Sequence, residues 1–171
     1  MRVGPMEEEV RGDPYHLERF IVAQSSGDTY RHALRELRGG RKTTHWMWFV
    51  FPQVSGLGRS QRSRTYAVSS LEEAKAFLQH TMLGPRLIEC TSTLLEVENR
   101  SAAEIFGPVD ARKLQSSMTL FMRAAPDVPL FGQVLDRYFN GSPDPATDQR
   151  LGRGPDGDRG EAGGVAVPPP T

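Results

Sequence analysis

The sequence predicts an all-α protein: a single compact domain of six to seven helices with disordered termini. Three observations lead to this fold class. Apolar residues recur at the three- and four-residue spacing of amphipathic helices along most of the chain. Residues that cap or break helices separate these periodic stretches. Only two short segments, 46–51 and 65–68, show an alternating pattern, and neither is followed by the turn residues of a β-hairpin.

Each expected helix begins near a residue that can accept hydrogen bonds from the N–H groups of the first turn. In chain order these expected N-caps are Asp13, Asp28, Thr43 or Thr44, Ser70, Ser101, Asp110 and Asp127. Ser70 and Ser101 each have a glutamate three positions later, the pattern of a capping box. The expected breaks, in the same order, are 25–27, Gly39-Gly40, Pro52, His80, Gly107-Pro108, Ala125-Pro126 and Gly141.

The apolar stripe of each periodic segment is expected to face the core. The principal members of these stripes are Leu17 and Phe20; Ala33, Leu34 and Leu37; Trp46, Phe49 and Val50; Leu71, Ala74 and Phe77; Leu83, Leu87, Cys90 and Leu94; Leu114, Met118 and Phe121; and Leu130, Val134 and Leu135. Residues 53–65 contain two glycines, three arginines and three serines, and we expect them to form a loop.

The domain boundaries follow from composition. Residues 1–12 are acidic and interrupted by glycine and proline, so we expect a disordered lead-in. Residues 13–141 contain all the expected helices. Residues 142–171 are rich in glycine, proline and aspartate and almost lack aliphatic residues, and we expect a disordered tail.

The charge is balanced overall but uneven along the chain. Formal net charge is zero, which predicts no general affinity for nucleic acid or membranes. The strip from Arg31 to Tyr66, however, holds eight basic residues against the single acid Glu36. Cys90 is the only cysteine, no signal peptide precedes residue 13, and no apolar run could span a bilayer. We therefore expect a cytoplasmic protein with no membrane association.

The segment 42–66 is the candidate functional region, because an aromatic helix leads directly into a flexible basic loop. At 100° per residue the aromatic side chains cannot all point one way, so Trp46 and Phe49 share one face while His45 and Trp48 share another. Either this helix is buried on all sides, or Trp48 or Trp46 stacks on a planar ligand such as a nucleobase. Guanidinium, hydroxyl and backbone N–H groups of the loop suit an anion. In the alternative interpretation its arginines are solvated and pair with Glu72, Glu73 or Glu104.

A second polar cluster lies on the helix expected after residue 110, where Lys113 is followed by Ser116 and Ser117. This cluster suggests a polar network that joins this helix to the tryptophan helix, or a lysine-activated serine nucleophile. The candidate ligand-binding residues are Lys42, His45, Trp48, Gln53, Arg59, Ser60, Arg62, Lys113, Ser116 and Ser117. If the site is catalytic, His45 is the best general acid or base, since histidine titrates nearest neutral pH, and Lys113 would be an electrostatic stabiliser. The four histidines are scattered, so no metal site or cofactor is expected.

The motifs HWMWFVFPQVSGLGRS, EEAKAFLQHTMLGPRL and IFGPVDARKLQSSMTLF, together with Tyr66-Ala67, resemble a bacterial family of uncharacterised helical proteins often labelled calpastatin. The resemblance covers about residues 13–147 and implies a compact helical fold with no established activity. A calpastatin-type inhibitor is a long disordered repeat chain, whereas this sequence has capped helices and a core, so the label does not describe it.

Three functions remain open from the sequence. The first is a pocket for a small anionic, nucleotide-like ligand, whose role as an enzyme is undecided. The second is a protein- or nucleic-acid-interaction module that uses the basic strip 31–64, with Trp48 as its anchor. The third is a helical domain whose aromatic residues are core and whose role depends on an unknown partner.

Overall fold

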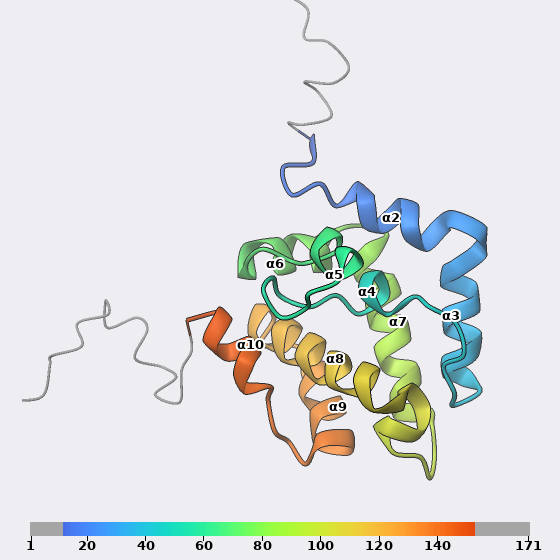
Figure 1. Cartoon of the computed structure of the whole chain (residues 1–171). Coiled ribbons are helices and arrows are strands. Elements are labelled where there is room, and N and C mark those ends of the chain that lie inside the picture. The colour runs from blue at the N-terminus through green and yellow to red at the C-terminus, as the bar shows by residue number, and fades with distance from the viewer. Residues whose placement is uncertain (1–11, 153–171) are drawn as a thin grey trace, which may run out of the picture.

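The computed structural model describes residues 12–152, and within them the regular elements are all helical (Figure 1). The helices are α2 (Glu18–Ser25), the 3₁₀ turn η1 (Ser26–Asp28), α3 (Thr29–Arg38), α4 (Met47–Val50), α5 (Gln61–Thr65), α6 (Leu71–Gln79), α7 (Leu83–Glu96), α8 (Ala102–Ala124), α9 (Leu130–Phe139) and α10 (Pro145–Arg150). Six of these elements have eight residues or more. The predicted all-α class is therefore confirmed. The lead-in predicted for residues 1–12 falls almost wholly outside the described residues.

Helix α8 is the central element of the fold. It has 23 residues and packs against α6, α9 and α10, while α7 packs against α3, α6 and α9 (Figure 1). The predicted capping box opens it: Glu104 N donates to Ser101 Oγ at 3.1 Å, and Ser101 N donates to Glu104 Oε1 at 2.9 Å. Gly107, at φ +79°, bends the helix just before Pro108. The predicted break is therefore confirmed: the backbone of Gly107, at φ +79° and ψ +162°, is not helical and separates residues 102–106 from the rest of α8, and a positive φ suits glycine.

The core is aromatic as well as aliphatic. Phe20, Trp46, Phe51, Phe77, Phe121 and Phe131 are among its largest fully buried side chains. Phe77 contacts both Phe20 and Phe121, with ring centroids 5.1 Å and 5.4 Å away, so one ring joins α2 to α6 and α8. These separations lie in the favourable range for aromatic pairs. Cys90 is also fully buried, as predicted, and burial raises the pKa of its thiol to about 12.

Four predicted N-caps do not cap a helix in the structure. Asp28 lies in the left-handed region at φ +56° and makes no capping hydrogen bond. Thr44 donates its hydroxyl to Glu36 instead of accepting from α4, which begins at Met47. Helix α9 begins after Pro129 and not at Asp127, and Asp110 lies inside α8. A capping side chain has several possible partners, and tertiary contacts decide among them.

The sequence had suggested that the whole segment 53–65 is a loop, and this is wrong for its last residues. Its last five residues form α5, which is capped by Ser60: Ser63 N donates to Ser60 Oγ at 3.0 Å. The base of the segment is closed by an isolated parallel bridge between Val54 and Val68. There Ser55 N donates to Val68 O and Val68 N donates to Gln53 O, each at 2.8 Å.

Arg19 fixes this segment to its surroundings. Its guanidinium donates to the backbone oxygens of Thr65 and Ala67, both at 2.8 Å, and forms an ion pair with Glu73 at 2.8 Å. Further donations reach Tyr15 O at 2.6 Å and His16 O at 2.7 Å. Both side chains of the ion pair are largely buried, with exposed fractions of 14% and 4%. The entry to α2, the 53–65 segment and α6 therefore meet at one residue.

The packed domain continues past Gly141, the end that composition predicted. Asp144 caps α10, because Thr147 N donates to Asp144 Oδ2 at 3.0 Å. Thr147 is fully buried and its hydroxyl lies 2.7 Å from Ser116 Oγ on α8. Arg123 binds Asp148 through two nitrogens at 3.0 Å and 2.9 Å. Residues 142–152 are thus part of the helical domain, and the remainder of the predicted tail lies outside the described residues. No helix between residues 12 and 152 is long and apolar enough to cross a bilayer.

Candidate functional site around Trp48

The two tryptophans at helix α4 lie in different environments. Trp46, directly before the helix, is fully buried, and Met47, Phe49 and Val50 also face the core. Trp48 is the exception and remains partly exposed. The two predicted faces therefore exist: one is core, and the other carries Trp48 toward α5 and α8. The alternative of a helix buried on all sides is wrong for this residue.

Two cations from different elements lie over the Trp48 ring. The guanidinium carbon of Arg62, on α5, is 4.9 Å from the ring centroid, and Lys113 Nζ, on α8, is 5.0 Å from it. Both distances are within the range of cation–π attraction. The two cationic groups are therefore no farther apart than the sum of these two distances. The structure brings together Trp48, Arg62 and Lys113, which the sequence had placed in the same candidate site.

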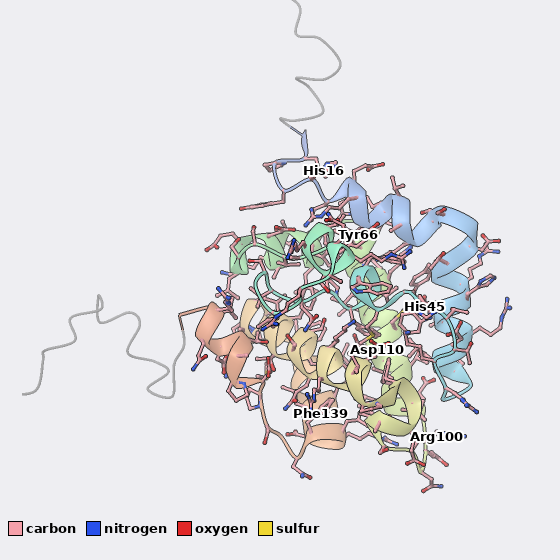
Figure 2. All side chains as sticks on the ribbon, in the orientation of Figure 1. His16, His45, Tyr66, Arg100, Asp110 and Phe139 are labelled. Atoms are coloured by element: carbon pink, nitrogen blue, oxygen red, sulfur yellow. The ribbon has the colours of Figure 1, made fainter. Side chains whose placement is uncertain are left out.

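A shared carboxylate extends this cluster toward Lys42. Asp110 forms an ion pair with Lys42 Nζ at 2.8 Å and a second, longer one with Lys113 Nζ at 3.4 Å. The Lys42 side chain is only 7% exposed, while those of Asp110 and Lys113 are 19% and 21% exposed. Lys42 Nζ also lies 5.2 Å from the Trp46 ring centroid. We call Lys42, Trp48, Arg62, Asp110 and Lys113 the Trp48 cluster (Asp110 is labelled in Figure 2).

The Trp48 cluster carries more positive than negative charge. It contains three cationic side chains and one carboxylate, which leaves two positive charges uncompensated within the cluster. The proposed pairing of the loop arginines with nearby glutamates is wrong for the described residues. Glu73 pairs with Arg19 and Glu104 belongs to a capping box, while Arg59, Arg62 and Arg64 form no ion pair within residues 12–152.

One hydrogen-bond donor in the cluster has no acceptor. The Nε1 atom of Trp48 is shielded from solvent and has no hydrogen-bond partner among the described residues. Buried polar groups are almost always paired, so an exception calls for an explanation. The neighbouring Trp46 shows the usual outcome, since its Nε1 donates to Glu36 Oε1 at 3.0 Å.

Glu36 organises the turn that leads into this site. Thr43 N and Thr44 N donate to its Oε1 at 2.6 Å and 2.9 Å, and Thr44 Oγ1 donates to Oε2 at 2.5 Å. Burial alone would raise the pKa of Glu36, but the hydrogen bonds from Thr44, Thr43 and Trp46 outweigh it and lower the pKa to about 2. Glu36 therefore stays ionised and fixes the backbone next to Lys42.

The other predicted site residues lie elsewhere or have other roles. His45 is exposed in the segment between α3 and α4, where Figure 2 labels it, and it makes no hydrogen bond within the described chain. Gln53 uses its backbone oxygen in the bridge to Val68, and Ser60 caps α5. Arg59 is exposed.

Ser116 and Ser117 on α8 are also explained by packing. Ser116 bonds the hydroxyl of Thr147, and Thr119 Oγ1 accepts from Asp144 N at 2.8 Å. The hydroxyl groups of this cluster therefore join α8 to α10, while Lys113 is the member that contacts Trp48 of the tryptophan helix, as predicted. Ser117 is fully buried with an unpartnered hydroxyl, so the structure offers it no lysine that could activate it.

Asp110 is the site residue that sequence reasoning missed, because it had been assigned as a helix cap. The available signal was its position three residues before Lys113, where an ion pair on one helix face is favourable. Among the described residues, no three His, Cys, Asp or Glu side chains form a group that could hold a metal ion.

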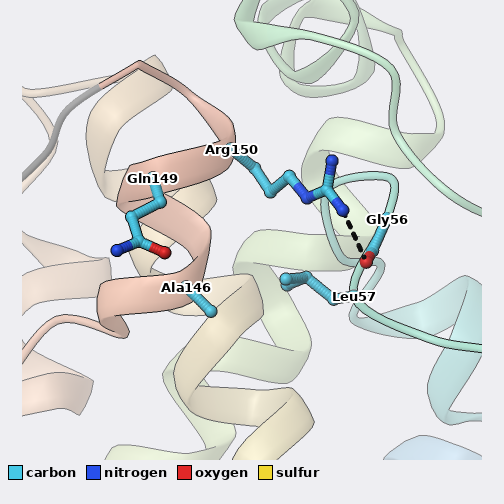
Figure 3. Close-up of a pocket in the computed structure, with 5 residues that line it drawn as sticks. All are labelled: Gly56, Leu57, Ala146, Gln149 and Arg150. Carbon is cyan, nitrogen blue, oxygen red and sulfur yellow. Dashed lines mark hydrogen bonds between the residues drawn. The ribbon is translucent and has the colours of Figure 1, made fainter.

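A separate hollow of about 490 Å³ lies between the 53–65 segment and α10 (Figure 3). Gly56 and Leu57 line one side of it, and Ala146, Gln149 and Arg150 of α10 line the other. None of the predicted site residues lines this hollow. Its α10 wall was assigned to a disordered tail, so the sequence alone could not indicate it.

Comparison with known proteins places the chain among proteins without an assigned activity. Residues 14–151 match the family described as "Protein of unknown function (DUF1810)". The chain also resembles a crystal structure of the conserved hypothetical protein Rv1873 from Mycobacterium tuberculosis, with 52% sequence identity and a TM-score of 0.80. That match covers 82% of this chain and 99% of the other. No curated protein matches the chain. Neither matching description carries the calpastatin label.

Proposed function

The chain belongs to the DUF1810 family, whose description assigns no function, and we propose that it binds a small anionic ligand of the nucleotide type through the Trp48 cluster. The observation that carries this proposal is the uncompensated positive charge next to an unpartnered indole N–H. Lys42 and Lys113 share one carboxylate, while Arg62 has none among the described residues, and Arg62 and Lys113 both lie over the half-buried Trp48 ring.

A phosphate group would satisfy these requirements together. Its oxygens accept charge-assisted hydrogen bonds from guanidinium and ammonium groups, which are stronger than neutral ones. The Nε1 atom of Trp48, which has no partner among the described residues, would donate to a ligand oxygen once a local rearrangement exposes it. A bound anion would also offset the mutual repulsion of the cations.

The geometry explains an anionic group better than a stacked base. Arg62 and Lys113 already lie over the Trp48 ring, so a nucleobase could stack there only after displacing one of them. We therefore assign recognition to the phosphate end of the ligand. His45 makes no hydrogen bond, ion pair or ring contact with the cluster in the described structure, so the proposal is for binding and includes no catalytic step.

Isothermal titration calorimetry of the full chain with ADP, pyrophosphate and adenosine tests this proposal. We expect ADP and pyrophosphate to bind and adenosine to give no signal. The double variant Arg62→Gln/Lys113→Gln should raise the Kd at least tenfold for each residue replaced, because each loses a charge-assisted bond of roughly 1.5–3 kcal/mol.

The matched control is Arg64→Gln/Arg112→Gln, which removes one exposed arginine from α5 and one from α8, neither of which forms an ion pair within residues 12–152. It should bind as the wild type does. Equal binding of ADP by both double variants, or binding of adenosine as tight as that of ADP, would contradict the proposal. Salt-sensitive binding of duplex DNA or an acidic protein that both double variants weaken alike would favour the basic strip 31–64 instead.

A further inference from the structure

We propose that the hollow between the Gly56–Leu57 turn and α10 is a second binding site, which takes small aliphatic carboxylates. This inference does not rest on the function proposed for the Trp48 cluster, because the two sites share no residue. The hollow has a volume of about 490 Å³, which is within the range of small-molecule sites.

The cation of this site is Arg150, which has donors to spare. Its Nη2 donates to Gly56 O at 3.2 Å, and within residues 12–152 its guanidinium has no carboxylate partner. A guanidinium carries five N–H donors, so most of them remain available to a ligand. The planar fork matches a carboxylate, which can accept two parallel hydrogen bonds from it.

Gly56 creates the position that Arg150 occupies. Its φ of +92° suits glycine, and a Cβ atom added there would lie 2.4 Å from Arg150 Cζ. The guanidinium thus lies directly on the backbone of the turn, as Figure 3 shows, at a place that any other residue type would fill. The glycine leaves room for the guanidinium, and the hydrogen bond to Gly56 O places it at the rim of the hollow.

The remaining walls determine the class of ligand. Leu57 and Ala146 face each other across the hollow, with Gln149 at its margin (Figure 3). Among the described residues no acid lines the hollow and Arg150 is its only cation, so the charge suits a single carboxylate better than a doubly charged phosphate. The Leu57 and Ala146 side chains provide an apolar surface for a short aliphatic chain.

Both walls are anchored, so the site exists before a ligand arrives. Arg123 and Ser116 of α8 hold α10 through Asp148 and Thr147. The Val54–Val68 bridge closes the segment that bears Gly56 and Leu57. The backbone of both walls therefore has little freedom left to lose on binding, which favours affinity.

Amide NMR spectra of the full chain, titrated with sodium acetate, butyrate, hexanoate or phosphate at constant ionic strength, test the assignment. We expect saturable shifts at the amides of Gly56, Leu57 and Gln149. Each added methylene should tighten binding by roughly two- to fourfold. Arg150→Gln should weaken butyrate binding by about tenfold or more.

A second variant protects the test against misfolding. Ala146→Leu changes an exposed helix position and should fill the hollow, so it should abolish hexanoate binding while leaving the other amide signals in place. Arg112→Gln and the Arg62→Gln/Lys113→Gln variant should bind butyrate as the wild type does. Unchanged butyrate affinity in Arg150→Gln, phosphate binding more tightly than butyrate at these amides, or the absence of saturable shifts would overturn the inference.

Discussion

At the scale of single residues, two neighbouring serines on α8 differ in what their burial costs. Ser116 and Ser117 are both buried, at 2% and 0% exposure. Ser116 shares a hydrogen bond with Thr147, whereas the Ser117 hydroxyl has no partner in the described structure. An unpaired buried hydroxyl is unfavourable, while a paired one is about neutral or stabilising.

Replacement of these serines by alanine should therefore have opposite effects. Ser117→Ala should leave the free energy of unfolding unchanged or raise it by up to about 1 kcal/mol, because it removes an unsatisfied group. Ser116→Ala should lower it by about 1 kcal/mol, because Thr147 loses a partner. Urea unfolding followed by circular dichroism measures both. A loss of stability in Ser117→Ala larger than that in Ser116→Ala would show that the Ser117 hydroxyl has a partner after all.

At the scale of elements, the connection from α3 to α4 depends on the carboxylate of Glu36. That side chain accepts hydrogen bonds from three residues of the connecting turn, Thr43, Thr44 and Trp46. The turn thereby fixes Lys42 on one side and α4 on the other. Local sequence reasoning assigned one of the two threonines as a cap. It could not identify their acceptor, because Glu36 belongs to a different helix.

This arrangement predicts a pH dependence of stability. The pKa of Glu36 falls from 4.5 to about 2 on folding, so its contribution is complete above pH 4.5 and is lost as the pH falls toward 2. Glu36→Gln should lower the free energy of unfolding by about 1 kcal/mol at pH 7, after allowance for solvent screening, and by clearly less at pH 3.

The comparison is made by urea unfolding at both pH values. Glu98→Gln is the control, because Glu98 is exposed and makes no hydrogen bond or ion pair with the described residues. Its effect should be small and similar at pH 7 and pH 3. An effect of Glu36→Gln that is larger at pH 3 than at pH 7 would contradict the assigned role.

At the scale of the whole molecule, the domain includes a helix that composition hides. The segment 142–152 is rich in proline, glycine and aspartate, which is typical of disorder. The same residues supply the cap Asp144, the first-turn Pro145 and the buried Thr147. The stability of α10 comes from its contacts with α8, and such long-range contacts leave little trace in local sequence.

A truncation after residue 141 should therefore be less stable than one after residue 152. Removal of residues 142–152 takes away the hydrogen-bond partners of Ser116 and Thr119, and it also removes Asp148, which Arg123 binds. We expect the thermal midpoint to fall by several degrees or more, since a loss of 1 kcal/mol shifts Tm by about 2–8 °C in domains of this size. Differential scanning calorimetry of the two truncated chains checks this, and equal midpoints would place the end of the domain at Gly141.

The sequence predicted those parts of the fold that depend on local pattern. Helical periodicity identified the core stripes, and the capping box at Ser101 formed as expected, because both are set within a few neighbouring residues. In the candidate site, the prediction that Trp48, Arg62 and Lys113 lie close together is confirmed, while their role in binding stays a prediction. Asp110 and the roles of Ser116 and Ser117 could not be found, because they depend on which distant segments meet α8.

Arg19 has a consequence for how the protein moves. One guanidinium holds the entry to α2, the end of the 53–65 segment and the buried Glu73 of α6. Thermal opening at any one of these places breaks the network that secures the other two, so they should open cooperatively, as a unit. The segment 53–65 therefore does not move independently. Its opening should require the same free energy as the opening of the helices that Arg19 connects to it.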